Sequence, residues 1–276
     1  AFNRSGKQTC CRIYFVQGTL EFMYDKFISQ GFTDIIDINL NEELKNLQNL
    51  IYLKTKYLLI KHDENLPVDE KIKLKFKEIP KSEFWSKLMY DLNSSTELKQ
   101  LICSKGIISA FNKIFNNPKL FEICMFRARF PNQKKVFYDW HQDEGTWFLS
   151  KNKKILNKFP ATLWFSINGA NHEDSIQLIK FSHKSKLHHH RYVKDQGFFS
   201  IDENKIIDPK KIVTIETKPS QCIIFHPLTL HRSIPQDKLN FRPRYSVDVR
   251  YYDPDFRPNF KINILFRLKK ILNILN

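Results

Sequence analysis

The sequence predicts an α+β protein, mainly β, built as a double-stranded β-helix (a cupin-like jelly roll) with a helical N-terminal layer. Apolar residues in the first part of the chain recur at helical spacing with few Gly or Pro residues, whereas after Pro118 the chain breaks into short runs bounded by turn residues. The later runs lack helical crossovers of the βαβ kind, which favours an antiparallel double-sheet jelly roll over a parallel α/β sheet.

The predicted helices cover residues 41–57 and 82–115. In the first of these, Leu44, Leu47 and Ile51 recur at intervals of three and four residues, which places them on one face of a helix. An apolar face of this kind predicts packing against the rest of the domain.

The predicted strands all lie after Pro118, and several of them alternate in polarity as half-buried strands do. They are Glu122 to Phe130, Ala161 to Ile167, Ile176 to Phe181, Lys211 to Thr217, Gln221 to His226 and Tyr245 to Tyr251. We expect a single domain over residues 1–276, with a mainly helical layer at 9–118, a jelly-roll core at 119–256 and a C-terminal amphipathic helix at 257–276.

The formal net charge of +16 favours an anionic partner. The charge is scattered, however, and no Lys/Arg block with interleaved aromatic residues predicts a nucleic-acid platform. We therefore expect no nucleic acid, and a small-molecule substrate that is anionic if the charge has a functional meaning.

The cysteine content and the hydropathy of the sequence indicate in which cellular compartment the protein is expected. The five cysteines form an odd set without a CxxC pair, which indicates reduced thiols. The sequence has no apolar run of membrane-spanning length and no signal-peptide pattern, so a cytoplasmic protein is expected.

The C-terminal stretch is amphipathic and basic. Ile264, Leu268 and Ile271 fall on one helical face, with Arg267 and Lys270 around the rest. Docking on its own domain or on a second subunit of a homodimer is the preferred interpretation, and contact with a membrane surface is the alternative.

A candidate metal site begins at His141 and Asp143, which stand two residues apart. In an extended backbone both side chains point to the same side, while Glu144 points away. His231 follows a strand-like run and is predicted to supply a third ligand. Two His and one carboxylate on one face of an octahedron leave positions for a bidentate 2-oxo acid and O2, as in non-haem Fe(II) oxygenases.

A dicarboxylic co-substrate also needs a cation for its far carboxylate, and the planar fork of guanidinium binds carboxylate bidentately. Arg242 lies eleven residues after His231 and is expected on the next strand, beside the metal. Arg244 is a competing candidate, because it falls on the same face of that strand.

Four stretches between about Glu122 and Tyr252 together resemble the phytanoyl-CoA dioxygenase family. The first is the His-x-Asp that ends at Asp143. The others are Thr162-Leu163-Trp164-Phe165-Ser166 with the acidic turn Gly169 to Asp174, the segment Ile179 to Lys184, and His231-Arg232-Ser233 with Phe241-Arg242. The chain departs from the family pattern at Ser175, where Gly is usual, and at Lys180-Phe181, where the family has Pro-Gly.

The resemblance implies hydroxylation of an aliphatic C–H bond with Fe(II), 2-oxoglutarate and O2, and release of succinate and CO2. It implies that His141, Asp143 and His231 are the catalytic iron ligands. It also implies that Arg242 anchors 2-oxoglutarate, because the Phe-Arg spacing matches the family, and that Ser233 and Trp164 line the same site.

Two other interpretations stay open from the residues alone. One is a non-catalytic jelly-roll binding protein. The other is an enzyme that uses the same His/Asp/His site for Zn or Mn. His188, His189 and His190 are expected in a surface loop rather than in a second metal site, His183 in a structural turn contact, and His172 and His226 as satisfied or solvated side chains. Tyr138, Trp140 and Trp147 are candidates for either substrate-pocket walls or supporting core.

Overall fold

The computed structural model describes residues 22–55, 83–121, 123–129, 138–149, 158–185, 187–194, 198–201, 208–234 and 244–256. The predicted C-terminal amphipathic helix and Arg242 lie outside the described residues. Within the described part of the chain no helix combines the length and apolar character needed to cross a membrane.

The helical layer contains α2 (Asn41–Thr55), α4 (Glu83–Asn93), α5 (Thr96–Ile102) and α6 (Lys105–Phe111). The predicted helix at 82–115 is therefore three helices. The breaks have a local cause, because the side chains of Ser95 and Ser104 accept hydrogen bonds from the backbone N–H groups of Leu98 and Ile107 and so begin new helices. A further helical segment at residues 22–30 was not predicted.

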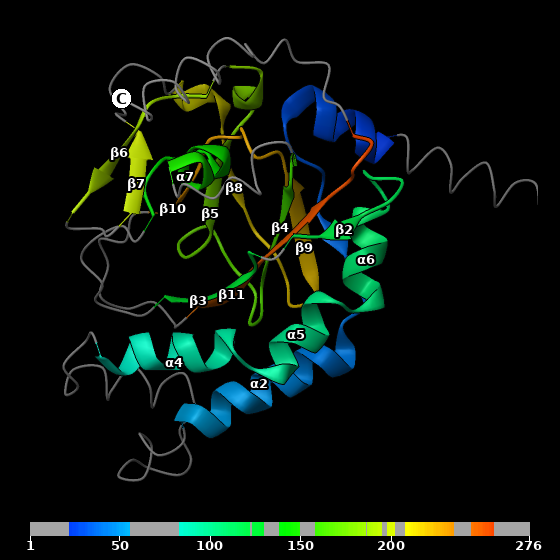
Figure 1. Cartoon of the computed structure of the whole chain (residues 1–276), viewed down its shortest axis with the longest axis vertical. Coiled ribbons are helices and arrows are strands. Elements are labelled where there is room, and N and C mark those ends of the chain that lie inside the picture. The colour runs from blue at the N-terminus through cyan, green and yellow to red at the C-terminus, as the bar shows by residue number, and fades with distance from the viewer. Residues whose placement is uncertain are drawn as a thin grey trace, which may run out of the picture.

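The larger sheet has the strand order β1-β9-β4-β11-β2, with β3 also paired to β11. Its strands are β1 (Ile36–Asp37), β2 (Lys119–Leu120), β3 (Met125–Arg129), β4 (Ala161–Ser166), β9 (Gln221–Phe225) and β11 (Arg244–Tyr252). All of its pairings are antiparallel. The long strand β11 lies between β4 and β3 and crosses the middle of the molecule (Figure 1).

A second antiparallel sheet has the order β10-β5-β8, formed by β10 (His231–Ser233), β5 (Ile176–Ile179) and β8 (Ile212–Ile215). A separate hairpin, β6 (His190–Val193) and β7 (Phe198–Ile201), stands beside the helix α7 (Asp143–Leu149). The two main sheets make a jelly roll rather than a closed barrel, as the fold prediction required. The hairpin, β1, β2 and β10 lie outside the predicted strand ranges, and β1 lies before Pro118, where no strand was expected.

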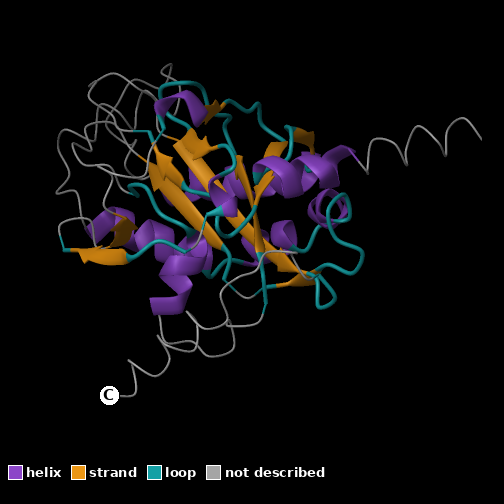
Figure 2. Cartoon of the chain, turned by 90° about the horizontal axis from the view of Figure 1, so that it is seen from above, coloured by secondary structure: helices purple, strands orange, loops and turns teal. Residues whose placement is uncertain are grey.

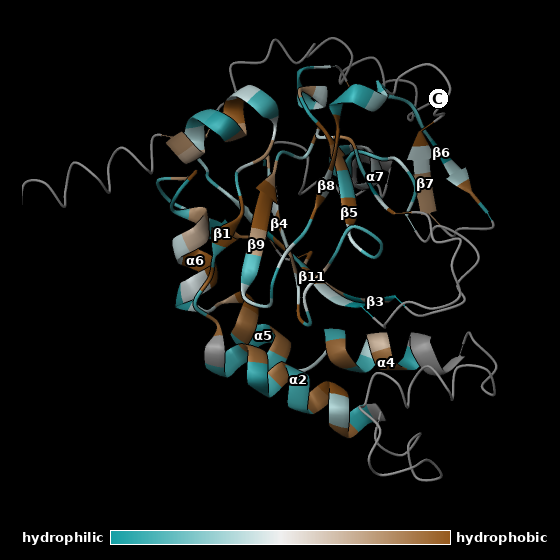
Figure 3. Cartoon of the chain, turned by 180° about the vertical axis from the view of Figure 1, so that it is seen from behind, coloured by the Kyte–Doolittle hydropathy of each residue, from teal (hydrophilic) through white to brown (hydrophobic). Residues whose placement is uncertain are grey.

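The larger sheet is covered on both faces. One apolar cluster joins the helices to the sheet through residues such as Leu47, Phe111 and Phe165, and a second cluster, which includes Trp164 and Leu178, fills the space between the sheets. All six residues of β4 are buried for this reason. Seen from above, strands occupy the centre and helices flank them (Figure 2), and α2 and α4 carry both apolar and hydrophilic residues (Figure 3).

The departure from the family pattern at Phe181 has a structural counterpart. Phe181 adopts a left-handed backbone with φ of 66°, a conformation that favours glycine. Its N–H donates to the carbonyl of Gln30 at 2.9 Å, and the following 3-10 turn, Ser182–Lys184, keeps Ser182 and His183 buried. The turn geometry is therefore retained without the usual glycine.

Candidate metal centre

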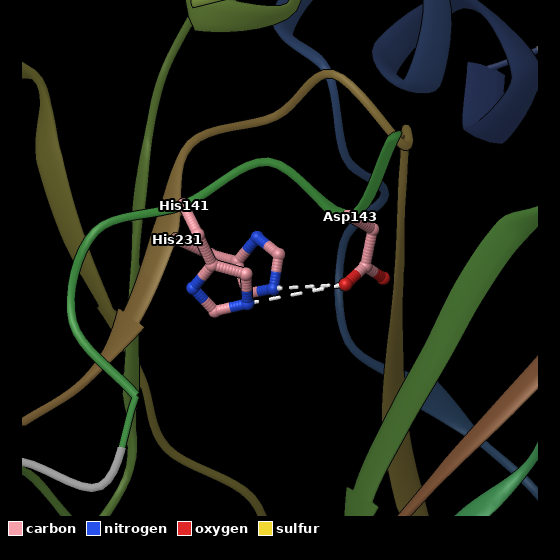
Figure 4. A group of neighbouring side chains, drawn as sticks. All are labelled: His141, Asp143 and His231. Atoms are coloured by element: carbon pink, nitrogen blue, oxygen red, sulfur yellow. Dashed lines mark ion pairs between the residues drawn. The ribbon is translucent and has the colours of Figure 1, made fainter. Parts of the chain in front are cut away.

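Three side chains converge between the sheets, from β10, from the segment before α7 and from the first residue of α7. They belong to His141, Asp143 and His231, and all three are at least nine-tenths buried. The Oδ1 atom of Asp143 lies 3.9 Å from Nε2 of His141 and 3.7 Å from Nε2 of His231 (Figure 4). The candidate ligand atoms all lie within 4.8 Å of one another, the spacing expected around a single ion.

Backbone pairing brings the two histidines together. His141 and His231 form an antiparallel bridge in which each N–H donates to the other residue's carbonyl at 3.0 Å. The expectation that an extended backbone also carries Asp143 was wrong, because α7 begins at Asp143. The chain turns into a helix directly after His141 and Gln142, and this turn, not strand alternation, directs the carboxylate toward the imidazoles.

Each imidazole is oriented by a hydrogen bond to a carbonyl two residues earlier. Nδ1 of His141 lies 2.6 Å from the oxygen of Asp139, and Nδ1 of His231 lies 2.9 Å from that of Thr229. A proton on each Nδ1 leaves the lone pair of Nε2 facing the centre, as a metal ligand requires. Burial lowers the pKa of both histidines, so both rings are neutral and available for coordination.

The carboxylate is held as an anion. Burial alone would raise the pKa of Asp143, but the charge of Arg250, the nearby His231 and His141 side chains and a hydrogen bond from Thr162 bring it well below its usual range. The Oγ1 of Thr162 donates to Oδ2 at 2.6 Å, and Nη2 of Arg250 lies 3.3 Å from the same oxygen. Neither Thr162 nor Arg250 was predicted as a site residue, because their contact with Asp143 depends on strand pairing.

Gln142 and His190 were also missed. Nε2 of His190 accepts the Gln142 N–H at 2.9 Å, and the Gln142 side chain donates to the carbonyl of Leu228 at 2.9 Å. The loop prediction for residues 188–190 was therefore wrong for His190, which is buried in β6. Gly145 makes this approach possible, because a Cβ at that position would overlap the His190 ring.

The other histidines agree with their expected roles. His183 is buried in its turn, with Nε2 at 2.8 Å from the carbonyl of Ile28. The His226 ring accepts the Leu228 N–H at Nδ1, and His172 is exposed. Among the described residues the group that could hold a metal ion is His141, Asp143 and His231.

A cavity extends from the three candidate ligands to Trp164, Ser233, Arg244 and Ser246. Arg244 donates from Nη1 to the carbonyl of Asp174 at 2.8 Å. Its Nε and the Oγ of Ser246 are buried and have no hydrogen-bond partner in the described part of the chain. Buried polar atoms rarely stay unpaired, so this end of the cavity fits a polar ligand.

The charge at this end favours an anion. Arg244 of β11 is paired in register with Arg129 of β3, and both are nearly fully buried. Burial lowers the pKa of Arg244 to about 10, and burial together with the neighbouring charge of Arg244 lowers that of Arg129 to about 9. Two adjacent buried cations are stabilised by a bound carboxylate.

The side of the cavity next to His141 is aromatic. Phe198 of β7 packs edge-on against Tyr138 at 4.5 Å and against the His141 ring at 4.7 Å, between ring centroids. The guanidinium of Arg127 lies 4.0 Å from the centroid of Tyr138 and pairs with Asp248 at 2.5 Å. Tyr138 is thus a cavity wall, whereas Trp140 belongs to a buried core cluster. The Trp147 side chain lies outside the described residues.

Comparison with known proteins connects this geometry to one family and one fold. The model of the phytanoyl-CoA dioxygenase (PhyH) family matches residues 40–238. No curated protein sequence matches the chain. Among solved structures, the non-heme monooxygenase ThoJ in its apo form superposes with a TM-score of 0.57 at 14% identity, covering 84% of this chain and 78% of ThoJ.

Two proteins of nogalamycin biosynthesis share the fold. The epimerase SnoN, in complex with Fe3+, alpha ketoglutarate and nogalamycin RO, has a TM-score of 0.53 at 13% identity, covering 86% of this chain and 84% of SnoN. The alpha ketoglutarate dependent carbocyclase SnoK has a TM-score of 0.50 at 16% identity, covering 91% of this chain and 90% of SnoK. At these identities the likeness is one of fold.

Proposed function

This chain belongs to the phytanoyl-CoA dioxygenase family of non-haem iron oxygenases, and we propose that it uses Fe(II), 2-oxoglutarate and O2 to hydroxylate an aliphatic C–H bond of a small molecule. Succinate and CO2 are the co-products. The observation that carries this proposal is a single cavity with two contrasting ends. One end holds a buried His/Asp/His group, and the other holds the unpaired polar atoms of Arg244 and Ser246.

The donor set suits Fe(II). His141 and His231 offer neutral imidazole nitrogens and Asp143 an ionised carboxylate oxygen, while no thiolate faces them among the described residues. Two imidazoles and one carboxylate leave positions open for exogenous ligands. Bound iron would supply the oxygen activation that amino-acid side chains cannot perform, and the protein holds the ligands and excludes water.

For the far carboxylate of 2-oxoglutarate we assign Arg244, together with Ser233 and Trp164. Arg244 and Ser233 line the cavity, and the guanidinium of Arg244 lies 5.4 Å from the centroid of Trp164. Ser246 adds a hydroxyl on the same face of β11. The assignment of this role to Arg242 stays a prediction, since that residue lies outside the described part of the chain.

The substrate would approach along Tyr138, which lines the cavity next to His141 and is backed by the ring of Phe198. An apolar or planar group fits that wall, and the net charge of +16 favours an anionic molecule. We also propose that the chain is one oxygenase domain with the layer boundaries given above, and that it works in the cytoplasm.

The test is succinate formation from 2-oxoglutarate by protein loaded anaerobically with Fe(II) and then exposed to O2. We expect turnover with Fe(II), none with Zn(II) or Mn(II), and none for His231→Ala. Turnover that requires Zn(II) or Mn(II) instead would identify a different metalloenzyme. Metal binding without any 2-oxoglutarate consumption would identify a binding protein.

A further inference from the structure

The two oxygens of Asp143 have different surroundings. Oδ1 faces the imidazoles, at 3.9 Å from His141 and 3.7 Å from His231. Oδ2 accepts a hydrogen bond from Thr162 Oγ1 at 2.6 Å and lies 3.4 Å and 3.3 Å from Nε and Nη2 of Arg250. One oxygen is thus directed to the metal centre, and the other is held away from it by protein groups.

We infer that Thr162 and Arg250 are positioning residues that restrict Asp143 to a single metal-facing oxygen, and so keep a coordination position free for the co-substrate. The inference rests on the proposed function, because a position must be kept free only if exogenous ligands bind the metal. It concerns two residues outside the proposed ligand set, of which Arg250 also lines the cavity.

Strand pairing explains how both residues reach the same oxygen. Thr162 of β4 and Arg250 of β11 are register partners in the larger sheet, so their side chains project from the same face. Both are essentially fully buried. Asp143, the first residue of α7, contacts both side chains through its Oδ2 atom.

Arg250 is itself held in place. Its Nη1 donates to the carbonyl of Ile123 at 3.0 Å, and its Nη2 lies 3.5 Å from Oδ2 of Asp248. Asp248 in turn pairs with Arg127 at 2.5 Å. The guanidinium is therefore fixed by groups outside the metal centre and cannot follow the carboxylate if Asp143 rotates.

Rotation of the Asp143 carboxylate toward the centre would break the hydrogen bond from Thr162 and separate Oδ2 from a buried guanidinium. Leaving a buried hydroxyl and a buried cation without this acceptor is unfavourable. The arrangement thus opposes bidentate coordination by Asp143. Without it, the second oxygen would compete with the 2-oxo acid for the metal.

Thr162→Val tests this, because valine keeps the shape and removes the hydroxyl. Fe(II) affinity and the 2-oxoglutarate affinity of the Fe(II)-loaded protein are both measured anaerobically, the second by charge-transfer absorbance. We expect 2-oxoglutarate affinity to fall by at least about tenfold, the scale of outer-shell effects at metal sites, and Fe(II) affinity to fall less. Thr162→Ser keeps the hydroxyl and should keep both affinities near those of wild type. The 2-oxoglutarate affinity of Arg250→Lys should lie between those of wild type and Thr162→Val.

Thr217→Val is the matched control. Thr217 is a buried threonine whose hydroxyl has no hydrogen-bond partner among the residues that the structure describes, so its replacement should leave both affinities unchanged. Equal 2-oxoglutarate affinity in wild type and Thr162→Val overturns the inference, as does a parallel loss of both affinities and melting temperature, which would indicate a structural role. Wild-type protein that binds neither Fe(II) nor 2-oxoglutarate overturns the proposed function itself.

Discussion

His141 and His231 exchange two backbone hydrogen bonds of 3.0 Å, so their imidazoles are placed by the backbone rather than by contacts between side chains. Each ring is then oriented by a carbonyl two residues earlier in its own segment. Neither the bridge nor these orienting carbonyls depend on the imidazole of the other histidine. Each imidazole can therefore be removed without removing the backbone contacts that join the two segments.

His141→Ala and His231→Ala should each abolish succinate formation while the circular dichroism spectrum and the melting temperature of the metal-free protein change little. The physical reason is that the backbone bridge survives both substitutions, whereas the metal loses a ligand. His189→Ala, at an exposed position, is the control and should keep wild-type turnover. Wild-type succinate production with full iron occupancy in either ligand variant would remove that residue from the ligand set.

Asp143→Ala should differ from the histidine variants, because it removes the acceptor that faces Arg250. A buried cation that loses its partner destabilises a protein by about 3–5 kcal/mol in the stronger cases, and the effect here is smaller because Arg250 keeps its contact with Asp248. We expect denaturant titration of the metal-free protein to give a clearly lower free energy of unfolding for Asp143→Ala than for His141→Ala. Equal stabilities would mean that the contact with Arg250 contributes little.

Fe(II) and 2-oxoglutarate together should raise the melting temperature in anaerobic buffer, since ligands that bind only the native state stabilise it by mass action. A ligand at a hundredfold excess over its Kd contributes about 2.7 kcal/mol. The measurement is thermal unfolding with each ligand alone and with both. The absence of any shift at saturating concentrations would count against the site.

Much of the core could be predicted because it depends on local sequence patterns. The strands at β4, β5, β8, β9 and β11 follow from apolar runs and alternation, and residue type, order and spacing selected the three candidate ligands, which the structure brings together. Short elements were missed. Strand β10 has only three residues, and β6 begins with the polar residues His190 and Arg191, so neither gives an apolar run. Their pairing depends on partners far away in the sequence.

The residues around the ligands were harder to predict for the same reason. Thr162 acts on Asp143 only because β4 and β11 are in register at Arg250, and His190 reaches Gln142 only because Gly145 leaves room for its ring. The turn into α7 at Asp143 also escaped prediction. Each of these contacts depends on tertiary packing, which leaves no periodic signal in the chain.

Stability of the metal-free protein should fall as the pH is lowered below neutrality. Burial lowers the pKa of His226 to about 3, whereas in the unfolded chain it is about 6.5. Between these values the unfolded state binds a proton that the folded state does not, so the free energy of unfolding decreases as pH falls. One such group gives a slope of about 1.4 kcal/mol per pH unit, and the lowered pKa values of His141 and His231 act in the same direction.

The measurement is denaturant titration of the metal-free protein at several pH values between about 7 and 5. His226→Asn should reduce the slope of stability against pH, because asparagine does not titrate in this range. His172→Asn removes an exposed histidine and should leave the slope unchanged. Identical slopes for wild type and His226→Asn would show that His226 is not a source of the pH dependence.

The final prediction concerns the arginine that holds the far carboxylate of 2-oxoglutarate. Arg244 and Ser246 both line the cavity, and the Nε of the first and the Oγ of the second have no hydrogen-bond partner in the described part of the chain. Arg244→Ala should therefore weaken 2-oxoglutarate binding strongly and Arg244→Lys less, since lysine keeps the charge but lacks the planar fork. Iron binding should stay nearly unchanged in both variants, because within the described residues Arg244 makes its hydrogen bond to the Asp174 carbonyl and none to His141, Asp143 or His231.

Arg242→Ala and Arg191→Ala complete the experiment, the second as a control at an exposed position of β6. The readout is 2-oxoglutarate affinity from the charge-transfer absorbance of the anaerobic Fe(II) complex. A strong loss in Arg242→Ala with a mild effect in Arg244→Ala would restore the anchor predicted from the family spacing. If both variants bind 2-oxoglutarate as wild type does, neither arginine is the anchor, and the carboxylate must be held elsewhere, with the Arg129 guanidinium opposite Arg244 as the next residue to replace.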